Sequence, residues 1–156
     1  RGLGDVYKRQ KCKCIMYENY TRQSLPAKEY RELLGSAICV FNSNNSFIIE
    51  NVLREDGGRN YNWYDLIDKT SGQLKAAIND TITTKAGSEI AQIFSDLVDK
   101  RNRIIHSFQI TNDDKKQILA TKDKQHNQFV ITKEYLLDFI KANEVLSDKL
   151  YTFRGY

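Results

Sequence analysis

Apolar side chains recur at helical spacing along four segments of the chain, a period that places them on one face of an amphipathic helix. The pattern predicts helices from Pro26 to Gly57, from about Asn62 to Asp80, from about Ser88 to Phe108, and onward from Thr132. Four such helices can close around one core as a bundle. The apolar stripes are Tyr30, Leu34, Ala37, Ile38, Phe41, Ile48 and Val52; Trp63, Leu66, Ile67, Leu74, Ala77 and Ile78; Ile90, Ile93, Phe94, Leu97, Val98, Ile104, Ile105 and Phe108; and Leu136, Phe139, Ile140, Leu146, Leu150 and Phe153.

Residues with capping chemistry stand near the expected helix ends. Ser24 is a candidate N-cap for the first helix and Thr132 for the last, because their hydroxyl oxygens can accept a hydrogen bond from the first helical turn. Glycine at the C-terminal end of the first helix permits the left-handed conformation that ends many helices. Asn44 and Asn45 interrupt the first apolar stripe, so they either line a cleft beside the candidate site or form a satisfied polar pair inside the bundle.

The segment between the last two long helices is polar and contains two short runs of strand-forming residues. Residues 117–121 and 128–132 fit either a β-hairpin around residues 122–127 or an irregular loop. The sequence therefore predicts an all-α protein, a bundle of four to five helices, with or without a short hairpin before the last helix.

The first ten residues, RGLGDVYKRQ, read like a translated sequencing adapter, and such scars are excluded from fold reasoning. We therefore expect three parts: residues 1–10 as an adapter-derived artefact, 11–25 as an N-terminal segment without its native start, and 26–154 as a single helical domain. Without the first ten residues, 21 basic and 19 acidic side chains remain. A net charge this small gives little support for nucleic-acid binding by itself.

Composition narrows the class of protein further. With 40% hydrophobic and 28% charged residues, the chain can bury a core. No run approaches the ~18 apolar residues of a membrane span, so we expect a cytoplasmic protein with no membrane partner. The three cysteines form no disulfide framework: Cys39 lies in an apolar helical run and is expected to be buried, and Cys12 and Cys14 are an incidental pair rather than a metal site.

One arginine breaks the apolar pattern of the third helix. Helical steps from Phe94 and Leu97 lead to Arg101 and then to Ile104, so a guanidinium lies in line with the core face. Because a buried charge without a partner is costly, Arg101 must either extend to the edge of the bundle or meet an anion or another subunit.

The residues after Arg101 supply further polar chemistry. Asn102 and His106 are four apart and share a helix face, and Lys100 and Arg103 add positive charge to the same turn. Histidine titrates near pH 6.5, so it can accept the proton of an RNA 2′-hydroxyl, and a guanidinium can stabilise charge on the phosphoryl oxygens. This set suits phosphodiester cleavage without a metal ion.

The segment Arg101-Asn102-Arg103-Ile104-Ile105-His106 resembles the R-N-x-x-x-H form of the HEPN domain motif, on a late helix of a helical bundle. The resemblance implies a metal-independent endoribonuclease of a toxin or phage-defence system, with no cofactor. It also implies a homodimer in which the motifs of two protomers form one site for RNA. By position, Arg101 and His106 would be catalytic, and Asn102, with Lys100 and Arg103, would bind or orient the substrate. An antitoxin protein, for example a minimal nucleotidyltransferase, would be a partner.

A second reading of the same residues stays open. Some HEPN proteins are inactive and act as modules for dimerisation, nucleotide binding or partner binding. A histidine near an apolar face is commonly structural, and a cationic turn is commonly a solvated surface. His126 lies in a polar loop and is expected to be solvated. The enzyme interpretation needs Arg101 and His106 both on an accessible surface near a dimer axis, whereas the module interpretation tolerates both of them buried in intramolecular pairs.

Overall fold

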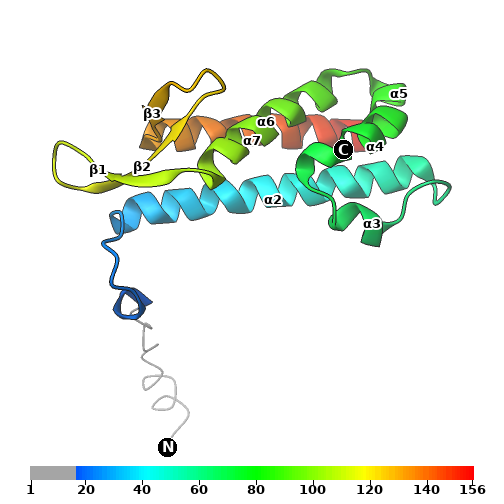
Figure 1. Cartoon of the computed structure of the whole chain (residues 1–156). Helices are drawn as coiled ribbons and strands as arrows, with labels where there is room; N and C mark the ends of the chain where they lie inside the picture. Colours follow the sequence, from blue (N-terminus) through cyan, green and yellow to red (C-terminus); the bar gives the residue numbers. More distant parts are fainter. Residues whose placement is uncertain (1–16) are drawn as a thin grey trace, which may run out of the picture.

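The computed structural model describes residues 17–156 (Figure 1). The predicted adapter-derived segment, residues 1–10, lies outside the described residues, as do Cys12 and Cys14. The described chain is mostly helical, and a short 3-10 turn, η1 (Tyr17–Tyr20), precedes the first long helix. No helix within residues 17–156 combines the length and the apolar character needed to cross a bilayer.

Three long helices build the bundle, and each corresponds to one of the four helices that the sequence predicts. They are α2 (Lys28–Asp56), α6 (Glu89–Ile105) and α7 (Lys133–Arg154). Helices α2 and α7 lie side by side, and α6 packs against both of them (Figure 1). The prediction of a helical bundle is confirmed.

The ends of the long helices follow the capping rules only in part. Thr132 caps α7 as predicted, because its side chain accepts a hydrogen bond from the backbone N–H of Tyr135. Gly57 ends α2 in the left-handed conformation, with φ of 61°. The prediction for Ser24 is wrong: α2 begins after Ala27, which makes no side-chain cap. A backbone that enters the helix just past Pro26 leaves Ser24 too far from the first turn.

The second predicted helix is a series of short turns. The segment contains α3 (Trp63–Ile67), a 3-10 turn η2 (Ser71–Leu74), α4 (Lys75–Ile78), a π-helical turn η3 (Asn79–Thr83) and α5 (Thr84–Ala86). A capping box at Thr70, completed by Gln73, starts a new turn and interrupts the helix. The prediction of one helix is therefore wrong, and Trp63 at its start is half exposed.

A small antiparallel sheet follows α6. Its strands are β1 (Phe108–Thr111), β2 (Gln117–Lys122) and β3 (Gln128–Val130), in the order β1-β2-β3. The β2–β3 hairpin is the predicted alternative to a loop. Strand β1 pairs with β2, Phe108 lying opposite Ala120. The chain is therefore mostly helical with a small sheet, of which strand β1 was not predicted. The extension of the third helix to Phe108 is wrong, because the chain leaves the helix after Ile105.

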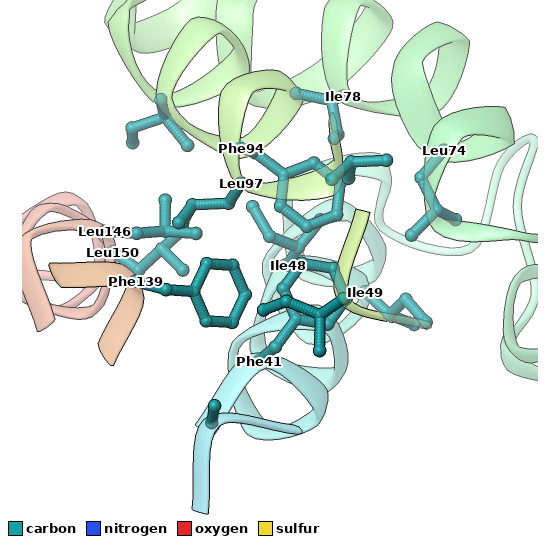
Figure 2. Packing of buried hydrophobic residues seen from close by; sticks show 14 of the residues in the cluster. Phe41, Ile48, Ile49, Leu74, Ile78, Phe94, Leu97, Phe139, Leu146 and Leu150 are labelled. Atoms are coloured by element: carbon teal, nitrogen blue, oxygen red, sulfur yellow. The ribbon is translucent and has the colours of Figure 1, made fainter. Parts of the chain in front are cut away.

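The core lies between α2, α6, α7 and the short helices. Phe41 stacks on Phe94 and on Phe139, with ring centroids 6.2 and 6.1 Å apart (Figure 2). The predicted stripes supply most of the buried side chains, but four of their members, Trp63, Ile67, Ile105 and Phe108, are exposed. Cys39 is exposed, so the prediction of a buried thiol is wrong. Ile105, also predicted to be buried, is 50% exposed.

The asparagines of α2 form a polar contact inside the bundle. The amide of Asn44 donates to the backbone carbonyl of Asn143 at 2.7 Å and to its side-chain oxygen at 3.1 Å. Asn143 donates in turn to the carbonyl of Phe139 at 2.9 Å. Of the two alternatives for Asn44, the structure has the satisfied polar pair. Asn45 takes no part in it, and its side-chain oxygen is buried without a partner.

Candidate functional site

The candidate motif occupies the last turn of α6. The buried stripe of α6 continues as far as Ile104, and the helix ends at Ile105. His106 caps it: its backbone N–H bonds to the carbonyl of Asn102 at 3.0 Å, and its φ of −93° and ψ of 28° turn the chain toward β1. The motif therefore lies at the junction of the bundle and the sheet.

Arg101 makes its contacts inside the subunit. Its Nη2 donates to the side-chain oxygen of Ser71 at 2.9 Å, and its Cζ lies 5.1 Å from the ring centroid of Phe41. A guanidinium stacks well on an aromatic face because it is planar and weakly hydrated. The Nε atom is buried without a hydrogen-bond partner. Arg101 is thus held at the edge of the bundle, and its buried Nε–H remains without an acceptor within residues 17–156.

His106 has a different environment. It is exposed, and its side chain forms no hydrogen bond within residues 17–156. Its neighbours Ile105 and Phe108 are also exposed, by 50% and 42%. Arg101 and His106 are five positions apart, and ideal helix geometry would place them about 140° apart around the helix axis. One subunit therefore does not bring the two predicted catalytic side chains to the same face.

The predicted binding residues are divided between two hollows. Asn102 lines a cavity between α6 and the η2–α4 segment. Lys100 and Arg103 line a shallow groove between α6 and the β2–β3 loop. Arg103 donates to the backbone carbonyl of Lys122 at 2.9 Å, which attaches this loop to the helix. Arg103, one of the cations predicted to bind the substrate, therefore makes a contact that stabilises the fold.

The loop beside this groove carries the second histidine. His126 is exposed, as predicted, and has a positive φ of 69°. Its Nδ1 lies 3.2 Å from the Nζ of Lys122, and Lys124 of the same loop forms an ion pair with Asp99 of α6 at 3.1 Å. The hairpin therefore brings more cations close to the motif than the sequence places there.

The cavity beside Asn102 is the more enclosed hollow of the two. Its volume is about 200 Å³. Ser71 lies in its wall and connects it to Arg101 through the hydrogen bond described above. Sequence reasoning missed Ser71, and the only local signal is the polar break at residues 68–72. The lining residues are Ser71, Gly72, Lys75, Ile78, Ala91, Phe94, Ser95, Val98, Asp99 and Asn102.

Within residues 17–156 no group of three or more histidine, cysteine, aspartate or glutamate side chains is arranged to hold a metal ion. No protein-family model, curated protein or solved structure matched this chain.

Proposed function

We propose that this protein is a metal-independent endoribonuclease of the HEPN type, acting as a symmetric homodimer. Arg101 of one subunit and His106 of the other would form each composite site. Two features support the proposal: the R-N-x-x-x-H motif itself, and its place at the end of a long helix in a helical bundle. Asn102 would orient the substrate, and Lys100 and Arg103 would attract its phosphates.

The observation that carries the proposal is the environment of His106. The exposed imidazole of His106 lies along the chain between Ile105 and Phe108, two apolar side chains that are also exposed. By helix geometry, Arg101 of the same subunit lies on another side of α6. Apolar surface of this kind favours a protein contact. A two-fold contact brings the same patch of both subunits together, and could place His106 opposite the partner's motif.

The chemistry needs only the two side chains and RNA. His106 would take the proton of a 2′-hydroxyl, whose oxygen then attacks the adjacent phosphorus. The bond from phosphorus to the 5′-oxygen breaks and leaves a 2′,3′-cyclic phosphate, and the leaving 5′-oxygen takes up a proton from water or from the protonated His106 to become a 5′-hydroxyl. Arg101 would stabilise the negative charge that develops on the phosphoryl oxygens.

The proposed setting follows from the resemblance. HEPN nucleases of this kind act in toxin–antitoxin or phage-defence systems, so we propose a cytoplasmic toxin with an antitoxin partner, for example a minimal nucleotidyltransferase.

A second candidate function has an observation in its favour. Arg101 is engaged by Ser71 and Phe41 in its own subunit, as a structural arginine would be. The protein would then be a non-catalytic HEPN-like module that dimerises or binds a nucleotide or partner. This alternative predicts no RNA cleavage even when the dimer is intact.

Substitution of Ile105 tests the composite site without touching either catalytic side chain. Ile105→Asp places a charge in the proposed contact and should convert the dimer to a monomer and abolish RNA cleavage. Val145→Asp is the matched control, because Val145 is 49% exposed on α7, distant from the motif along the bundle. Light scattering reports the mass, and a fluorescent RNA reports cleavage.

The control should remain a dimer and cut RNA at the parental rate. If parental protein is a monomer at micromolar concentration, or if Ile105→Asp cuts RNA as a monomer, the composite site is wrong. If the dimer forms but the parental protein cuts no RNA, the non-catalytic module is the better account.

A further inference from the structure

A cavity of about 200 Å³ opens to the surface between α6 and the η2–α4 segment. Its apolar wall is built from side chains at the edge of the core, Ile78, Phe94 and Val98. A flat, partly apolar ligand would therefore find contact surface there.

Ser71 gives this wall a buried polar group. Ser71 is only 6% exposed, and its oxygen accepts the hydrogen bond from Arg101. A serine hydroxyl can also donate one hydrogen bond, and Ser71 donates none within residues 17–156. A buried donor without an acceptor is unfavourable, so this hydroxyl is available to a ligand that carries an acceptor.

The other polar side chains of the cavity offer both donors and acceptors. Asn102 offers an amide that can do both, Asp99 a carboxylate that only accepts, and Lys75 an ammonium group that only donates. The edge of a nucleobase presents donors and acceptors side by side, and amide and carboxylate side chains read such edges.

Size restricts the ligand further. Pockets for drug-sized molecules span roughly 300–1,000 Å³, so this cavity has room for one heterocycle and not for its sugar and phosphate. The sugar and phosphate would remain outside, where Lys75 is exposed to solvent. Proteins that read single-stranded RNA commonly take one unstacked base in this way.

We infer that this cavity is a binding site for one unpaired nucleobase of an RNA strand. The choice of RNA as the source of the base rests on the proposed function, and the site deepens that function by giving it a means of selecting sequence. The hydrogen bond from Arg101 to Ser71, together with Asn102, connects the base site to the candidate catalytic motif.

The test measures binding of small probes rather than cleavage. The probes are the four ribonucleosides and their 5′-monophosphates, titrated into the whole protein and followed by NMR chemical shifts. At least one base should bind both as the nucleoside and as the monophosphate, and inorganic phosphate should not displace it. Displacement by inorganic phosphate would overturn the inference, because it would mark an anion site.

Two variants fill the cavity from different positions on α6. Ala91→Leu and Ser95→Leu each add bulk to a lining position, and Ser95 is exposed, so the second variant should fold even if the first does not. Ala76→Leu is the matched control, an exposed alanine on α4 that does not line the cavity. Ala91→Leu and Ser95→Leu should each weaken nucleoside binding by about tenfold or more, and Ala76→Leu should weaken it by less than about twofold.

The outcomes separate this inference from the proposed catalysis. The base site is wrong if no nucleoside binds at millimolar concentration. It is also wrong if Ala91→Leu and Ser95→Leu both bind nucleosides with the affinity of the parental protein. Both conclusions hold whether or not the protein cuts RNA. If binding depends on the cavity and RNA is not cut, the base site stands and the proposed catalysis fails.

Discussion

Replacement of Arg101 by alanine should lower the stability of the fold, because the side chain is held by two contacts of its own subunit. Arg101 donates to Ser71 at 2.9 Å and lies 5.1 Å from the ring centroid of Phe41. A hydrogen bond from a charged donor contributes about 1.5–3 kcal/mol, and a cation–π contact about 0.5–2 kcal/mol. Because Arg101 is only partly buried, we expect a loss at the lower end, about 2–3 kcal/mol in all.

The free energy of unfolding is measured by urea denaturation, and the melting temperature by circular dichroism. A loss of about 2–3 kcal/mol should lower the melting temperature by about 4–12 °C for a chain of this length. Lys100→Ala is the control, since Lys100 precedes Arg101 on α6 and is exposed. Its effect should stay within about 0.5 kcal/mol.

Ser71→Ala separates the two contacts, because it removes the hydrogen bond and leaves the ring of Phe41 in place. The double variant should lose less stability than the two single variants together, since both single changes break the same bond. If Arg101→Ala has the same melting temperature as Lys100→Ala, Arg101 is not held in this way. The same conclusion follows if the losses of stability in Arg101→Ala and Ser71→Ala simply add.

Three further predictions concern the core, acid stability and metal ions. Ile104→Ala should lower the free energy of unfolding by about 2–5 kcal/mol through a cavity, because Ile104 is fully buried; a melting temperature equal to that of the parent would contradict this. The backbone N–H groups of Asn60 and Tyr61 donate to the Asp56 carboxylate and hold its pKa below the usual 3.8. These hydrogen bonds therefore stabilise the fold above pH 3.8, and their contribution is lost as the pH falls through the lowered pKa. Urea denaturation of Asp56→Asn should show a lower stability at neutral pH and a weaker loss in acid, and an unchanged acid profile would refute the assignment. RNA cleavage should persist in EDTA, and cleavage that stops with the chelator and returns with Mg²⁺ would show a different mechanism.

The long helices could be predicted because apolar residues recur at helical spacing through each of them, on both sides of the polar positions Asn44, Asn45 and Arg101. The start of α7 could be predicted too, since the hydroxyl of Thr132 lies three residues before the N–H that it accepts from. The segment from Asn62 to Asp80 failed because its apolar residues keep the helical period across a break that local hydrogen bonds impose. Thr70 and Gln73 form those bonds, and periodicity alone does not register them.

Strand β1 was missed for a different reason. Phe108 continues the apolar spacing of α6, but it pairs with Ala120 of β2, which comes later in the chain. Pairing of this kind depends on residues that are distant in the sequence, so a local pattern does not reveal it.

The candidate site shows the same limit. The motif could be found in six consecutive residues, but the partner of Arg101 lies thirty positions earlier, in a turn that was predicted as helix interior. The cavity beside Asn102 exists because that turn packs against α6. No sequence period indicates such a contact.

The most direct test of the proposed function compares the two histidines of the chain in one assay. His106→Asn and His126→Asn remove the same imidazole, and asparagine tolerates the positive φ of position 126. Cleavage of a fluorescent single-stranded RNA is measured in EDTA with matched protein concentrations. Proton transfer by a positioned side chain is worth about 10²–10⁴ in rate, so His106→Asn should lose at least about a hundredfold, while His126→Asn keeps the parental rate. A His106→Asn protein that cuts RNA at the parental rate would contradict the account, because His126 is the only other histidine of the chain and is tested in parallel.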